Sequence, residues 1–103
     1  MYADEDIPIH VSEEGREYRM PPLIWKGLEE YRVNGRGGGG FLGCVLANDL
    51  SGAVLRADPM SMRSLRDIVK YLHNELPSKS FGSLDEVIAY RRNKEKEREE
   101  DDS

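Results

Sequence analysis

Residues that typically start or end helices, namely proline, glycine and capping residues, recur in the middle of this 103-residue chain at intervals that suit short helices. A first helix is expected to begin at Pro21–Pro22, because proline is tolerated in a first helical turn. It is expected to end at Asn34–Gly35, since both residues accept a left-handed backbone. Asp58–Pro59 is a strong start signal for another helix, which Pro77 stops. These boundaries predict an all-α fold.

Two more helices complete the predicted bundle. Apolar residues form a broad face between Phe41 and Ala57, which predicts one helix there, although Ser51–Gly52 can break it into two. The last helix starts at Ser83, which forms a capping box with Glu86. That helix is expected to bury Leu84, Val87 and Ile88. The prediction is a small compact bundle of about four helices, in one domain over residues 21–90.

Both ends of the chain add charge-rich segments to this bundle. Within residues 1–20, apolar and polar residues alternate over Ile7–Val11, and the chain can turn at Ser12–Gly15 and pair back. This pattern is typical of a short hairpin, and a flexible acidic arm is the alternative. Residues 91–103 contain no apolar side chain, so we expect a fraying, solvated charged tail.

The net charge of −5 comes from the two ends of the chain. Residues 1–20 carry −4 and residues 83–103 carry −3, whereas residues 21–82 carry +2. Because the centre is mildly basic, neither DNA mimicry nor DNA binding describes the whole protein.

Composition also bears on location and cofactors. No apolar run approaches the ~20 residues that span a bilayer, so no membrane partner is expected, and the acidic N-terminus is unlike a secretory signal. Cys44 is the only cysteine, so no internal disulfide can form and a cytoplasmic location is expected. His10, His73 and Cys44 lack the spacing of zinc ligands, so no metal and no cofactor are predicted.

The glycine-rich segment Arg36–Gly40 runs directly into the second predicted helix. Consecutive glycines before a helix can form a nest of N–H groups for an anion, and Arg36 would add positive charge. The segment lacks the lysine and Ser/Thr of a phosphate-binding P-loop, since Phe41 follows instead. A flexible connector is therefore the alternative to a binding role for Arg36, Gly39, Gly40 and Phe41.

Asp49 and Arg56 are the more diagnostic candidates. On one continuous helix, both fall inside the apolar stripe that begins at Leu42. A carboxylate among core positions is costly unless it is paired or hydrogen-bonded. The residues therefore either form an internal ion pair or a cap for a neighbouring helix, or they line a groove or an interface between protomers.

No residue pattern indicates catalysis. Asp49 has no second carboxylate at a useful spacing for acid–base work, and no Ser/His/Asp or Cys/His arrangement is persuasive. Arg63, Arg66 and Lys70 form a basic stripe on the third predicted helix, which could meet phosphates or simply face solvent. We therefore predict a protein that is not an enzyme.

From Pro21 to Ser83 the chain resembles a family of short, largely uncharacterised proteins of bacteriophages and other bacterial mobile elements. The resemblance lies in the segments Leu28–Val33, Gly39–Leu42, Val45–Leu50, Arg56–Asp58 and Ile68–Pro77. It implies a bacterial cytoplasm and an accessory role in a mobile element, and it brings no established activity. Asn48 and Asn74 lie in these segments and complete the set of candidate binding residues.

These observations lead to three hypotheses of function. The first is a non-enzymatic interaction protein of a phage or mobile element, one that inhibits a host defence protein by binding it. The second is an oligomeric sponge for a nucleotide or similar anion, using Arg36, Arg56 and the glycine loop. The third is a nucleic-acid-binding regulator that uses the basic stripe, with duplex DNA the less expected partner. A homo-oligomer is expected for the sponge.

Overall fold

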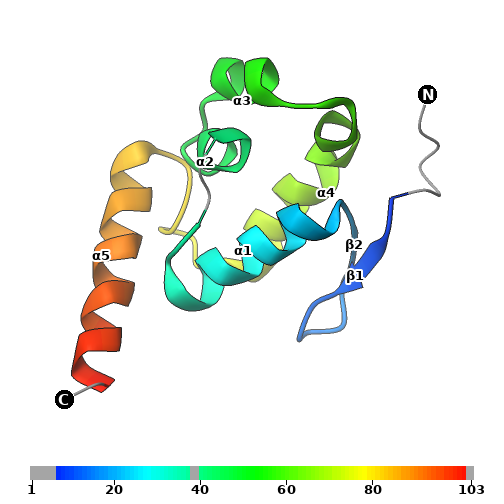
Figure 1. Cartoon of the computed structure of the whole chain (residues 1–103). Helices are drawn as coiled ribbons and strands as arrows, with labels where there is room; N and C mark the ends of the chain where they lie inside the picture. Colours follow the sequence, from blue (N-terminus) through cyan, green and yellow to red (C-terminus); the bar gives the residue numbers. More distant parts are fainter. Residues whose placement is uncertain (1–6, 38–39, 102–103) are drawn as a thin grey trace.

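A computed structural model describes residues 7–37 and 40–101 of the chain. The described part is mostly helical, as expected, and carries a small two-stranded sheet (Figure 1). It contains five helices and not four. In chain order the elements are β1 (Ile9–Val11), β2 (Glu17–Arg19), α1 (Pro22–Asn34), α2 (Gly40–Leu46), α3 (Leu50–Arg56), α4 (Pro59–Glu75) and α5 (Leu84–Asp101).

The ends of α1 and α4 lie where local chemistry predicts them. Gly35 ends α1 with a φ of 68°, and its N–H donates to the Tyr31 carbonyl. Asp58 caps α4 by accepting a hydrogen bond of 2.7 Å from the Ser61 N–H. Each of these contacts spans only a few residues, which is why the sequence alone predicts them.

The Asp58 cap should make stability depend on pH. Hydrogen bonds from Ser61 lower the pKa of the Asp58 carboxyl. A lowered folded-state pKa contributes stability that is present above the unfolded value of about 4 and is lost as the pH falls through the folded value. Asp58→Asn keeps a capping oxygen and removes the titration. We expect the stability difference between the two proteins to shrink on acidification, measured by urea unfolding at several pH values.

Residues 7–20 form the hairpin and not a flexible arm. β1 and β2 pair antiparallel, with His10 opposite Tyr18. Ile7, Tyr18 and Met20 are buried in the core, so the hairpin is a packed part of the domain. His10 stacks on Trp25 of α1, with ring centroids 5.0 Å apart. Residues 1–6 lie outside the described part of the chain.

The single helix expected from Phe41 to Ala57 is wrong, because the chain breaks between α2 and α3. The break is not at Ser51–Gly52. It falls at Asn48, whose φ of 60° is left-handed and ends α2, and at Asp49, which caps α3. Asparagine tolerates this conformation better than most residues, and aspartate is a favoured helix cap. The helical wheel that placed Asp49 in an apolar stripe therefore does not apply.

Two buried tyrosines anchor the core between α1 and α4. Tyr31 donates a hydrogen bond of 2.5 Å to the buried Ser80 carbonyl, and burial raises its pKa to about 12. Tyr71 contacts Tyr18 edge-on, with centroids 5.4 Å apart. Its hydroxyl is buried without a hydrogen-bond partner among the described residues, and burial, with the nearby Glu29 carboxylate, raises its pKa.

The same substitution should therefore have different effects at these two positions. Tyr31→Phe removes a buried donor from Ser80 and should cost about 1–2 kcal/mol of unfolding free energy. Tyr71→Phe removes a buried, unpaired hydroxyl and should leave stability unchanged or raise it by up to about 1 kcal/mol. Urea unfolding of both variants tests this, and equal losses would contradict the described hydrogen bonding.

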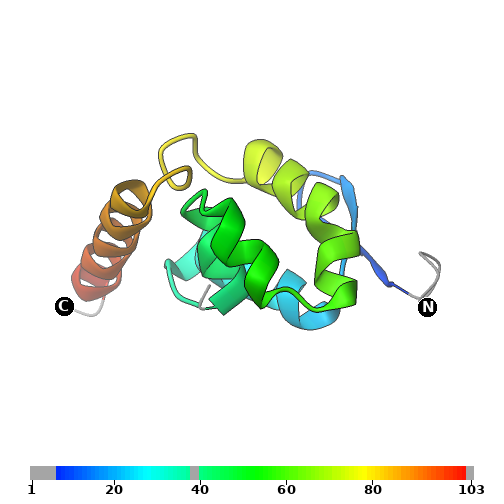
Figure 2. The ribbon, with the colours of Figure 1, turned by 90° about the horizontal axis from the view of Figure 1, so that it is seen from above.

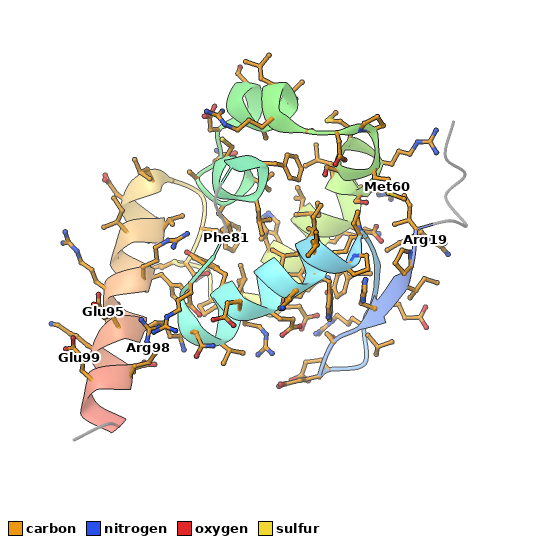
Figure 3. The ribbon with its side chains drawn as sticks, in the orientation of Figure 1. Arg19, Met60, Phe81, Glu95, Arg98 and Glu99 are labelled. Carbon is orange, nitrogen blue, oxygen red and sulfur yellow. The ribbon has the colours of Figure 1, made fainter. Side chains whose placement is uncertain are left out.

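The charged tail does not fray after residue 90, because α5 continues through Asp101. Two of its arginines turn toward the C-terminal end of α1, where backbone carbonyls lack helical partners and the helix dipole is negative. Arg91 donates to the Gly37 carbonyl at 2.5 Å, and Arg98 donates to the Asn34 carbonyl. Figure 3 shows Arg98 directed toward α1, with Glu95 and Glu99 on the other side of α5.

Among the side chains of residues 84–99, only that of Val87 is buried. The expected burial of Leu84 and Ile88 is wrong, since they are 62% and 39% exposed. α5 lies at one end of the molecule and the hairpin at the other, so few elements cover it (Figure 2). Apolar side chains on its first two turns therefore remain at the surface.

Candidate functional site

The corner between α2 and α3 is held by the Asp49 cap. Asp49 Oδ1 accepts a hydrogen bond of 3.0 Å from the Gly52 N–H, and the Asp49 N–H donates to the Cys44 carbonyl at 2.8 Å. Gly52 is buried against this cap. A Cβ there would overlap Asp49 Oδ2 and lie 2.9 Å from Cys44 Sγ. Glycine is therefore required where the two helices meet.

A groove of about 570 Å³ runs between this corner and the first turns of α5. We call it the α2–α5 groove. The Gly82 N–H donates to the Leu46 carbonyl at 2.8 Å, which fixes the start of α5 beside the end of α2. From α2, α3 and the turn between them, its lining is Gly40, Gly43, Cys44, Ala47, Asp49 and Arg56. From α5 it is Leu84, Val87, Ile88 and Arg91.

Arg56 stands at the edge of this groove and also lines a second pocket. That pocket, of about 420 Å³, lies against Leu23 and Ile24 of α1. The Arg56 guanidinium donates to the Gly52 carbonyl at 3.3 Å and contacts Cys44 Sγ at 3.6 Å. Among the described residues it forms no ion pair, so the internal Asp49–Arg56 pair is not present. Asp49 acts as a helix cap, which was the other expectation.

The structure brings together only some of the predicted site residues. Gly40, Asp49 and Arg56 line the α2–α5 groove. Asn48 is exposed beside a smaller hollow between α3 and α4. Phe41 is half-buried and lines the second pocket.

The remaining candidates are not part of the groove. Arg36 is exposed outside it, and Asn74 lies at the far side of α4, near Glu13 and Glu14 of the hairpin. Gly39 lies outside the described residues. The anion nest expected in the glycine loop includes that position, so the nest remains a prediction.

Sequence reasoning missed the contribution of α5 to the groove. Leu84 and Ile88 stand four residues apart and therefore share one face of the helix, and Arg91 follows on that face. This spacing was visible, but it suggested a core face. The exposure of Leu84 and Ile88 depends on how far α2 and α3 extend over α5, and a local sequence pattern cannot predict that extent.

The groove is chemically simple. It offers an apolar surface with two guanidinium groups and one carboxylate that is engaged as a cap. Within residues 7–37 and 40–101, no cluster of three or more His, Cys, Asp or Glu side chains is placed to hold a metal ion. Such a surface can bind, and its described residues include no pair arranged for proton transfer.

The outer side of α3 adds further exposed apolar surface next to the groove. Leu50 and Leu55 are 68% and 83% exposed, and Val54 is exposed between them. Only Ser51 interrupts this side with a polar group. Contiguous exposed apolar side chains of this kind often mark interaction surfaces.

Comparisons with protein families, with curated proteins and with solved structures found no match to this chain. The resemblance to proteins of bacterial mobile elements therefore stays a prediction. In the described part of the chain, none of the helices is both long enough and apolar enough to cross a bilayer.

Proposed function

We propose that the protein is a non-enzymatic interaction protein that binds a partner protein in the α2–α5 groove. The observation that supports this proposal is the exposure of Leu84 and Ile88 beside the guanidinium groups of Arg56 and Arg91. Exposed apolar side chains beside a concave surface are typical of sites where a few anchor residues of a partner supply most of the binding energy.

The chemistry of the groove suggests the partner's features. An amphipathic helix or loop would place an apolar side chain on Cys44, Ala47 and Val87. A carboxylate beside that anchor would meet Arg56 or Arg91. The resemblance to mobile-element proteins suggests a host defence protein in the bacterial cytoplasm, which this chain would inhibit by occupying it.

The test uses tagged full-length protein and two matched variants. Ile88→Glu places a charge in the groove, whereas Val33→Glu places one at a similarly exposed apolar position of α1 outside it. A partner captured from host lysate by the wild type is identified, purified and titrated by calorimetry. We expect Ile88→Glu to weaken its binding at least about 30-fold, as loss of a hot-spot contact does, and Val33→Glu to leave it unchanged. Equal weakening by both variants would refute the groove as the site.

The nucleotide sponge remains the competing function, because Arg56 and Arg91 approach the groove from different helices. Calorimetry of the same protein with linear and cyclic nucleotides separates the two functions. Saturable nucleotide binding that disappears in Arg56→Ala would favour the sponge, above all if the solution mass shows a homo-oligomer. Partner binding without nucleotide binding would favour the interaction protein.

A further inference from the structure

The hairpin adds a cation to the basic stripe of α4. Arg63, Arg66 and Lys70 are exposed at helical spacing and cover about 10 Å of the helix. Arg19 of β2 joins Arg63 and Arg66 around one pocket of about 240 Å³, although it lies 44 residues earlier in the chain. We call these four residues the α4 basic face. In Figure 3, Arg19 lies on the hairpin at the end of the molecule away from α5.

The cations of α4 are not used to stabilise the fold. Within the described part of the chain, Arg63, Arg66 and Lys70 form no ion pair, unlike Arg16 and Arg32, which pair with glutamates. A solvated helix surface usually mixes charges of both signs, so three unpaired cations on one side are informative.

In the described part of the chain, two carboxylates of α4 accept hydrogen bonds from the hairpin. Asp67 Oδ2 accepts a hydrogen bond of 2.6 Å from the Arg19 backbone N–H. Glu75, near the end of α4, accepts one of 2.6 Å from the Tyr18 hydroxyl. Asp58 caps the start of α4 by accepting a hydrogen bond from the Ser61 N–H. Among the described residues, the exposed cations Arg63, Arg66 and Lys70 therefore outnumber the one carboxylate that lines the pocket, that of Asp67, in a protein whose net charge is −5.

We propose that the α4 basic face binds the phosphate backbone of a nucleic-acid duplex. Guanidinium groups suit phosphate oxygens because they donate in a planar fork, and a duplex repeats such oxygens along each strand. An apolar side chain of a partner protein would find little complementary surface in this pocket, whose described lining is three arginines, an aspartate and Ile7. This proposal does not depend on the α2–α5 groove.

Fluorescence anisotropy with a labelled duplex of about 20 base pairs tests the proposal on the full-length protein, with DNA and RNA duplexes in separate arms. The variant Arg63→Ala/Arg66→Ala/Lys70→Ala removes three charges from the face. The control Lys26→Ala/Lys79→Ala/Arg92→Ala removes three exposed charges elsewhere, so both proteins have the same net charge. All six side chains are exposed, and circular dichroism checks that both variants fold.

We expect the wild type to bind a duplex with an affinity that falls steeply with salt. Three phosphate contacts predict a slope of about −3 in a plot of log K against log salt concentration. The face variant should lose binding at least about tenfold and lose most of the slope, whereas the control should keep both. Equal binding of the DNA and RNA duplexes would indicate contact with the phosphate backbone alone. A preference for one duplex would identify whether the ligand is DNA or RNA. Absence of duplex binding at low salt, equal loss in both variants, or equally tight binding of polyglutamate would overturn the proposal.

Discussion

Gly52→Ala should destabilise the protein by about 2–3 kcal/mol, although the same change in an ordinary helix stabilises by about 1 kcal/mol. The new Cβ would overlap the Asp49 carboxylate and crowd Cys44 Sγ. Asp49 can move only by giving up its hydrogen bond to the Gly52 N–H, so the α3 cap is lost as well. Urea unfolding measures the loss.

Ser51→Ala is the matched control for this prediction. Ser51 is the neighbouring residue on α3 and is exposed, so its replacement should change stability by no more than about 0.5 kcal/mol. A double-mutant cycle tests the mechanism. In an Asp49→Ala background, where the carboxylate is absent, Gly52→Ala should cost much less than in the wild type. Equal costs in the two backgrounds would show that the cap is not the source of the effect.

Gly35→Ala should be the second large effect, at about 2–3 kcal/mol. Gly35 has a φ of 68°, which disfavours any residue with a Cβ. The added Cβ would also lie 2.7 Å from Lys94 Cβ, at the contact between α1 and α5. Backbone strain and displacement of α5 therefore add together at this position.

Gly15→Ala separates these two contributions. Gly15 also has a positive φ, of 84°, but a Cβ there would meet no atom within 4 Å. It should cost only the backbone strain, about 1–2 kcal/mol. Thermal and urea unfolding of both variants should therefore show a larger loss for Gly35→Ala. If the losses are equal, α5 does not pack on α1 as described.

The sequence was most informative where structure depends on contacts within one helical turn. The starts and ends of α1 and α4 follow from Pro22, Gly35, Asp58 and Pro59, whose effects are local. The break after α2 is also local, and the pair Asn48–Asp49 could have revealed it. The apolar periodicity of residues 41–57 outweighed that signal, because two short helices in succession can share one apolar pattern.

The sequence indicated the residues that line the groove from α2 and α3, but not those that line it from α5. Asp49 and Arg56 stood out because charged residues interrupted an apolar pattern, and both do line the groove. The sequence pattern predicts that Leu84 and Ile88 are buried, whereas both are exposed. Periodicity identifies an apolar face but not whether other elements cover it. The number and length of the surrounding helices decide that coverage.

The sequence by itself determined the helical class, the caps and the charge of each segment, because these depend on residue type and on neighbours a few positions away. The tertiary structure alone decided which cations meet which carbonyls and which cations share a pocket. Arg98 turns to the end of α1 across 64 residues, and Arg19 lines one pocket with Arg63, which lies 44 residues later. Such contacts depend on how whole elements pack, and packing is a property of the folded chain that local pattern does not contain.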